Sequence, residues 1–176
     1  MDQTRTSFKR KIKVLIVDDS LLFREALANG IAQDAAIEVV GTASDPYIAR
    51  DKILELEPDV LTLDVEMPRM SGIEFLKRLM PQYPIPVVVV SAVSDNVFNA
   101  LNAGAVDFVT KPNTKSQLSM RSFINELIIK IKIASTAKVG RWKIEEKNNR
   151  EVAAKKGCET SKILAIGAST GGTEAI

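Results

Sequence analysis

Five short apolar runs, each ending in polar residues, recur along the chain. The runs are Lys13–Val17, Ile37–Ala43, Val60–Leu63, Pro86–Val90 and Val106–Val109. They are rich in β-branched residues, which is typical of strands buried on both faces of a sheet. Segments with apolar residues at helical spacing separate the runs and follow the last one. We expect these helices over residues 21–33, 46–57, 72–80, 94–104 and 116–134.

This alternation predicts the α/β fold class, with one domain over residues 11–135. Parallel neighbours in a sheet require crossover helices, so five β/α repeats predict a five-stranded, doubly wound parallel sheet. The strand order 2-1-3-4-5 is one common arrangement of such sheets, and it places strands one and three side by side.

The pattern changes after residue 135. Residues 136–161 are rich in Lys, Arg, Glu, Asn and Ala and have no regular apolar spacing, which indicates a charged linker. Within residues 162–176, Ile163–Ile166 is a new strand signal and Gly167–Gly172 a new tight turn. We expect this segment to be the truncated start of a second α/β domain, because one strand and one turn cannot form a core.

Composition narrows the classes of function. With 45% hydrophobic residues, 26% charged residues and a net charge of +2, we expect a cytoplasmic protein with specific partners, no nucleic acid partner and no membrane insertion. A single cysteine, Cys158, excludes a disulfide framework and a cysteine-based zinc site. The chain has no histidine, which excludes a complete Ser/His/Asp triad within it.

Polar residues gather where the predicted strands end. The side chains in question are Asp18 and Asp19 after strand one, Asp64 after strand three, Ser91 after strand four and Lys111 after strand five. Ligands of open parallel sheets bind at the carboxyl ends of the strands. Three converging carboxylates repel one another and need a counter-charge, and an all-oxygen cluster of this kind suits Mg²⁺.

Four spaced motifs resemble the response regulator receiver family. They are Val17–Ser20, Leu63–Pro68 with Ser71–Gly72, Val90–Ala92, and Phe108–Pro112. The resemblance implies a flavodoxin-like receiver fold. It also implies that Asp64 is the phosphoacceptor for a chemotaxis histidine kinase, with Mg²⁺ as cofactor.

The resemblance assigns further roles around Asp64. Asp19 and Asp64 would bind Mg²⁺ directly, Asp18 through water, and Glu66 through its backbone carbonyl. Lys111 would pair with the phosphoryl oxygens, Ser91 and Phe108 would form a switch pair, and the Lys111–Pro112 peptide bond would be cis.

Residues 162–176 are similar to the start of the catalytic domain of the chemotaxis protein-glutamate methylesterase family. Gly167–Gly171 fits the pattern G-x-S-x-G, in which a strand-to-helix turn exposes a nucleophilic serine. The resemblance implies that Ser169 attacks glutamate methyl esters, and glutamine amides, of methylated chemoreceptors. Its His and Asp partners would lie beyond Ile176, so we expect this chain to be inactive as an esterase by itself.

Two alternatives remain open from the residues. A haloacid-dehalogenase-like phosphatase also uses a strand-end Asp, but it needs a second Asp two residues later, where this chain has Glu66. A receiver with another output, such as a DNA-binding domain, would need a helix-turn-helix pattern after the linker.

Overall fold

The computed structural model describes residues 10–92, 97–112 and 117–139. Five strands and five helices alternate along these residues. They are β1 (Ile12–Val17), α1 (Leu21–Ile31), β2 (Ile37–Ala43), α2 (Pro46–Leu56), β3 (Val60–Asp64), α3 (Gly72–Leu79), β4 (Val87–Ser91), α4 (Val97–Asn102), β5 (Asp107–Thr110) and α5 (Gln117–Ala134). The predicted α/β class is confirmed, and all ten elements expected between residues 13 and 134 are present, although several helix ends differ by one to three residues from the predicted ones.

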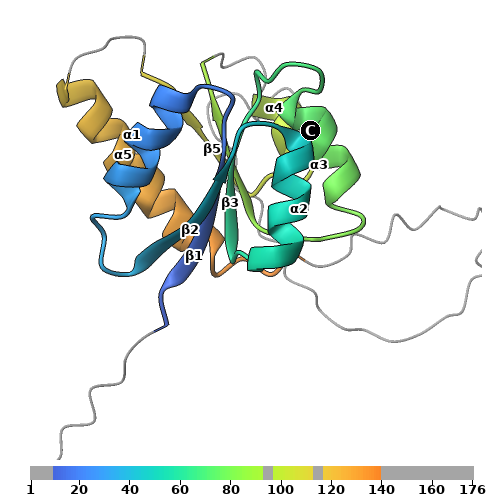
Figure 1. Ribbon diagram of the computed structural model, residues 1–176, viewed down its shortest axis with the longest axis horizontal. Coiled ribbons are helices and arrows are strands. Elements are labelled where there is room, and N and C mark those ends of the chain that lie inside the picture. Colours follow the sequence, from blue (N-terminus) through green and yellow to red (C-terminus); the bar gives the residue numbers. More distant parts are fainter. Residues whose placement is uncertain (1–9, 93–96, 113–116, 140–176) are drawn as a thin grey trace, which may run out of the picture. The chain divides into compact units, whose positions relative to one another are not determined.

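The strands form one parallel sheet in the order β2-β1-β3-β4-β5 (Figure 1). The register places Val17 beside Leu63 and pairs Asp64 with Val90. The ends of β1 and β3 therefore meet at one edge of the sheet, as the strand order 2-1-3-4-5 requires. The predicted flavodoxin-like fold is confirmed.

Helices cover both faces of the sheet (Figure 1). Alternate residues of β1 divide between two apolar cores, because successive side chains of a strand point to opposite faces. Leu15 and Val17 join the core under α2, α3 and α4, whereas Val14 and Ile16 join the core under α1 and α5. Burial on both faces explains why the strands are continuous apolar runs.

Side-chain caps fix where three helices begin. Ser20, Asp45 and Ser71 each accept a hydrogen bond from a backbone N–H in the first turn of α1, α2 and α3. Gly104 follows α4 with φ of 106°, a left-handed conformation that glycine adopts without strain. The cap of α1 lies close to the end of β1.

One structural expectation is wrong. No cis peptide bond occurs in the described residues, so the Lys111–Pro112 bond is trans. Proline only weakens the preference for trans, by a margin that leaves trans the ground state unless tertiary contacts oppose it.

No helix among the described residues is both long and apolar enough to cross a bilayer.

Candidate functional site

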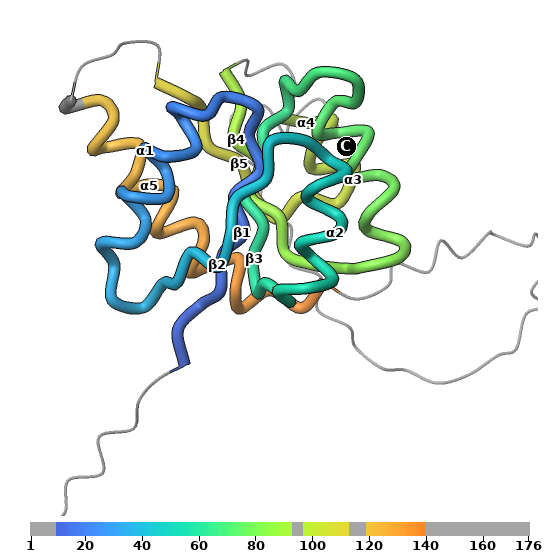
Figure 2. Tube along the Cα trace, in the orientation of Figure 1, coloured from blue at the N-terminus to red at the C-terminus, as the bar shows by residue number. Residues whose placement is uncertain are grey.

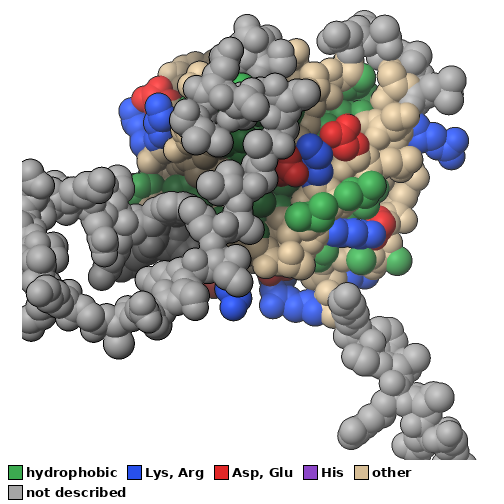
Figure 3. Space-filling model, turned by 180° about the vertical axis from the view of Figure 1, so that it is seen from behind, with side chains coloured by type: hydrophobic (Ala, Val, Ile, Leu, Met, Phe, Trp, Pro, Cys, Tyr) green, Lys and Arg blue, Asp and Glu red, His purple; other side chains and the backbone are tan. Residues whose placement is uncertain are grey.

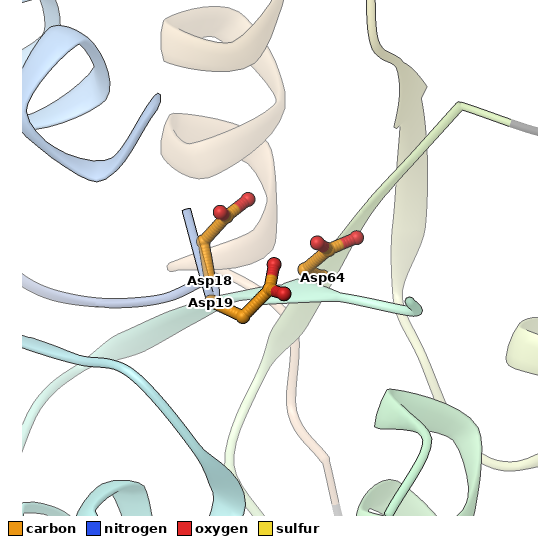
Figure 4. Close-up of side chains that lie close together, drawn as sticks. All are labelled: Asp18, Asp19 and Asp64. Atoms are coloured by element: carbon orange, nitrogen blue, oxygen red, sulfur yellow. The ribbon is translucent and has the colours of Figure 1, made fainter. Parts of the chain in front are cut away.

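The strand order brings three carboxylates together at one edge of the sheet. Asp18 and Asp19 follow β1, and Asp64 ends β3. One oxygen from each of the three lies within 4.8 Å of the others. Figure 4 shows these carboxyl groups gathered around a common space. The predicted convergence of Asp18, Asp19 and Asp64 is confirmed.

Lys111 supplies the counter-charge. Its Nζ atom lies 2.8 Å from Oδ2 of Asp18 and 2.7 Å from Oδ2 of Asp64. Burial alone lowers the pKa of Lys111, but its hydrogen bonds to the two carboxylates outweigh burial and raise the pKa. The lysine is therefore a fixed positive charge between the ends of β1, β3 and β5.

Asp64 is held at the bottom of this site. Its side chain is 2% exposed, and its Oδ1 atom accepts a hydrogen bond from the backbone N–H of Glu66 at 3.2 Å. Burial raises the pKa of Asp64 above its ordinary value, and the hydrogen bond from Lys111 opposes that rise. A carboxylate that is both desolvated and paired with a lysine is typical of functional sites.

Asp18 is anchored from two directions. Its Oδ1 atom accepts from the backbone N–H of Ser20 at 2.9 Å, and its backbone carbonyl accepts from the guanidinium of Arg24 at 2.6 Å. Asp19, by contrast, is exposed. The sequence did not indicate the role of Arg24, although an arginine six residues after Asp18 reaches back across the first turn of α1.

Phe23 is a second site residue that sequence reasoning missed. The ammonium of Lys111 lies 4.6 Å from the centroid of the Phe23 ring, within the range of a cation–π contact. The ring also packs against Phe123 of α5, with 5.7 Å between centroids. Position 23 follows the apolar spacing of α1, so nothing in the sequence separates it from an ordinary core residue.

The segment from β3 to α3 is tightly folded over Asp64. The backbone N–H of Gly72 donates to the carbonyl of Val65 at 2.9 Å, and a Cβ atom at position 72 would overlap the carbonyl oxygen of Asp64. Arg69 adopts φ of 71°, a strained conformation for a residue with a side chain. Glycine at 72 is therefore required by close approach of the backbone.

Ser91 and Phe108 lie on the neighbouring strands. Ser91 is 5% exposed at the end of β4, and its carbonyl accepts from the backbone N–H of Lys111 at 2.8 Å. Phe108 is half-buried on β5, where the ammonium of Lys130 lies 4.9 Å from its ring centroid. Their roles as a switch pair stay a prediction.

Two sequence expectations lie outside the described residues. Ser169 and its turn belong to residues 140–176, as does nearly all of the linker over 136–161.

On the face drawn in Figure 3, basic and acidic side chains of the described residues are interspersed and form no continuous basic surface.

Comparison with known proteins shows to which family the chain belongs. The sequence profile of the response regulator receiver domain matches residues 14–122. The chain is 61% identical over 167 residues to a protein of Syntrophomonas wolfei named protein-glutamate methylesterase/protein-glutamine glutaminase 2, a match that covers 95% of this chain and 48% of that protein. It is 53% identical over 180 residues to a protein of Syntrophotalea carbinolica named protein-glutamate methylesterase/protein-glutamine glutaminase, covering 95% and 50%. The chain thus spans about half the length of the curated relatives it matches.

Solved structures agree with the profile. The response regulator domain of Thermotoga maritima CheB is 41% identical, with a TM-score of 0.67, over 73% of this chain and 99% of that one. A chain in the CheX-CheY-BeF3-Mg complex of Borrelia burgdorferi is 30% identical, with a TM-score of 0.54, over 64% of this chain and 87% of that one. From its fold and its profile match, the chain belongs to the response regulator receiver family.

Proposed function

We propose that this chain is the phosphoryl-accepting regulatory part of a chemotaxis protein-glutamate methylesterase, and that Asp64 is the residue phosphorylated. The observation that carries the proposal is the contact between Lys111 and Asp64 beside Asp18 and Asp19. A buried carboxylate next to a fixed cation can attack a phosphoryl group and then hold the product through charge-assisted hydrogen bonds.

The chemistry is a group transfer onto a carboxylate. An oxygen of Asp64 forms a bond to phosphorus, and the bond between phosphorus and the donor's leaving group breaks. The leaving group keeps the bonding electron pair. Lys111 then moves its hydrogen bond from Asp64 Oδ2 to an oxygen of the phosphoryl group. The donor is phosphohistidine of a chemotaxis histidine kinase, or a small acyl phosphate in its place.

The donor set fits Mg²⁺. Carboxylate oxygens within 4.8 Å of one another are hard ligands, and Mg²⁺ combines a few such ligands with water and phosphate oxygens. Asp19 and Asp64 would hold the ion directly, Asp18 through water, and Glu66 through its backbone carbonyl. When bound, Mg²⁺ supplies positive charge that offsets the negative charge of the carboxylates and the incoming phosphoryl group. The Borrelia burgdorferi complex, which contains Mg²⁺, supports the choice of ion.

The output that we infer is hydrolysis of glutamate methyl esters, and of glutamine amides, on chemoreceptors in the cytoplasm. The names of the relatives at 61% and 53% identity support it. Ser169 would be the nucleophile. The base that activates such a serine is ordinarily histidine, and this chain has none, so we infer that the base is supplied by the remaining esterase domain.

Mass spectrometry of the intact protein tests the phosphoacceptor. With acetyl phosphate and Mg²⁺ we expect one added phosphoryl group in wild type and none in Asp64→Asn. Asp51→Asn, which changes an exposed carboxylate on α2, should be labelled like wild type. Equal labelling of Asp64→Asn, or labelling of wild type in EDTA, contradicts the proposal.

Methanol release from methylated receptor membranes tests the output. We expect no release by the 176-residue chain, and release by a longer protein that carries this chain and the remaining esterase domain. Ser169→Ala in that longer protein should abolish release without affecting phosphorylation of Asp64. Full activity of the Ser169→Ala protein would contradict the assignment of the nucleophile.

A further inference from the structure

An apolar groove lies at the opposite edge of the sheet from the acidic site, where β3 and β4 begin. It has a volume of about 440 Å³ and is formed by the last turn of α2 and by the segments that precede β3 and β4. Its lining includes Leu54, Tyr83 and Pro84, and its acidic members are Glu57 and Asp59. Leu54 and Tyr83 are 49% and 46% exposed. Two large side chains in one hollow therefore remain open to solvent within the described part of the chain.

The chain that follows α5 passes this edge of the sheet. The salt bridge between Lys132 and Asp34, at 2.7 Å, fixes the last turns of α5 beside the loop that precedes β2. Beyond Ala134 the chain turns beneath the sheet and runs from the α5 side to the α2 side (Figures 1 and 2). Val139, the last described residue, is partly buried. The start of the linker therefore stays against the domain and heads toward the face that carries the groove.

The two described residues that precede β1 lie at the same edge of the sheet. These residues, Arg10 and Lys11, are both exposed. Arg10 reaches Asp59 only through its side chain, at 3.0 Å. Of the two segments that meet this edge, the linker is therefore the better candidate to fill the groove.

The next linker residues match the groove in chemistry. They are Arg141-Trp142-Lys143-Ile144, a bulky aromatic residue between two cations. Trp142 is three residues beyond Val139, a separation of about 10 Å when extended. The indole suits an apolar hollow that has a polar rim, and the flanking cations suit the exposed carboxylate of Glu57.

We propose that Trp142 docks in the groove formed by Leu54, Tyr83 and Pro84, with Arg141 facing Glu57. Because the linker is attached to the same domain, the effective concentration of Trp142 near the groove is high, and a modest contact area suffices.

Trp142 is the only tryptophan, so its fluorescence reports on the groove directly. In the 176-residue chain we expect emission that is blue-shifted, and less quenched by acrylamide, relative to the urea-unfolded chain. Leu54→Glu should move emission and quenching toward the unfolded values. Ile48→Glu, at an apolar position on α2 that is 40% exposed and does not line the groove, should leave both unchanged. Circular dichroism confirms that each variant is folded.

Two charge-reversal variants test the contribution of the polar rim of the groove. Glu57→Lys should increase quenching of Trp142, whereas Glu55→Lys, also exposed on α2 but outside the groove, should not. Three results overturn the proposal. The first is wild-type emission like that of the unfolded chain, which is also expected if Phe8 fills the groove. The second is buried emission that Leu54→Glu does not change. The third is a blue shift lost on dilution, which would assign the groove to a second copy of the chain.

Discussion

The ammonium of Lys111 lies over the ring of Phe23, 4.6 Å from its centroid, while it contacts Asp18 and Asp64. The aromatic ring of α1, the carboxylate of Asp18 just after β1 and the carboxylate of Asp64 at the end of β3 approach the same cation from different sides. Because the ring face is electron-rich, it attracts the ammonium without accepting one of its protons. We therefore expect Phe23 to keep Lys111 in place when its hydrogen bond moves from Asp64 to a phosphoryl group.

We expect Phe23→Leu to slow phosphorylation of Asp64 by acetyl phosphate. A cation–π contact of this kind is worth about 1 kcal/mol, which corresponds to a rate about fivefold lower. The time course of the intact mass measures the rate. Phe123→Leu is the matched control, because Phe123 contacts the Phe23 ring and does not face Lys111. Equal slowing in both variants would instead indicate loosened packing between α1 and α5.

The sequence predicted most of the acidic site because it follows from topology. Asp18, Asp19 and Asp64 end strands that are adjacent in the order β2-β1-β3-β4-β5, so their convergence needs no side-chain detail. Arg24 and Phe23 could not be predicted in the same way. Their roles depend on how the first turn of α1 is placed against Asp18 and Lys111, which apolar spacing does not specify.

Helix boundaries are likewise predictable only where a local interaction sets them. The helices α1, α2 and α3 begin at the predicted residues, where Ser20, Asp45 and Ser71 cap them through a local interaction between a side chain and the next turn. The predicted end of α1 at Gln33 is two residues too long, since α1 ends at Ile31 and the chain then turns toward β2.

Gly72→Ala should destabilise the domain and impair the site together. The added methyl group would overlap the carbonyl oxygen of Asp64, which is backbone and cannot move without displacing the end of β3. Overpacking of this kind costs about 1–3 kcal/mol, measured as the free energy of unfolding in urea. We also expect slower phosphorylation of Asp64, because its carbonyl and carboxylate move together.

Gly41→Ala provides the comparison for this prediction. Its new Cβ atom would lie 2.8 Å from Cδ1 of Leu56, the flexible end of a side chain. Leu56 can rotate away, so we expect a smaller loss of stability and an unchanged phosphorylation rate. A loss in Gly41→Ala as large as that in Gly72→Ala would contradict the argument from backbone contact.

The ion pair between Asp34 and Lys132 should contribute stability that depends on pH. The hydrogen bond from Lys132, and then that from the backbone N–H of Ala36, lower the pKa of Asp34 below 3.8. A lowered pKa in the folded state means that the contribution is present above 3.8 and is lost as the pH falls through the folded-state value. Because the pair is partly solvated, Asp34→Asn should cost about 0.5 kcal/mol near neutral pH.

Urea unfolding of wild type and Asp34→Asn at two pH values measures this effect. The difference between the two proteins should disappear once Asp34 is protonated in wild type. Asp51→Asn, which removes a more exposed pair with Arg50, should change stability less at either pH. A difference of the same size at neutral and acidic pH would assign the effect to packing at position 34 instead of charge.

The last prediction concerns the response to phosphorylation. Ser91 and Lys111 are joined by a backbone hydrogen bond at the ends of β4 and β5, so a movement of one strand end is passed to the other. We expect the Ser91 hydroxyl to move to a phosphoryl oxygen and Phe108 to occupy the space that it leaves. Moving a two-state population from 1:99 to 99:1 requires about 5.5 kcal/mol of differential stabilisation, which a few charge-assisted hydrogen bonds to the phosphoryl group can supply.

Ser91→Ala should therefore leave phosphorylation of Asp64 intact but block the conformational change at Phe108. Its Asp64 should still be phosphorylated, because the hydroxyl of Ser91 takes no part in bond formation at phosphorus. NMR with beryllofluoride and Mg²⁺ should show a shift around Phe108 in wild type and in Ser44→Ala, a serine at the end of β2, but none in Ser91→Ala. If Phe108 shifts equally in Ser91→Ala, the signal reaches β5 by another route. The direct link from Asp64 through Lys111 to β5 would then be the one to test, because Lys111 follows Phe108 by only three residues.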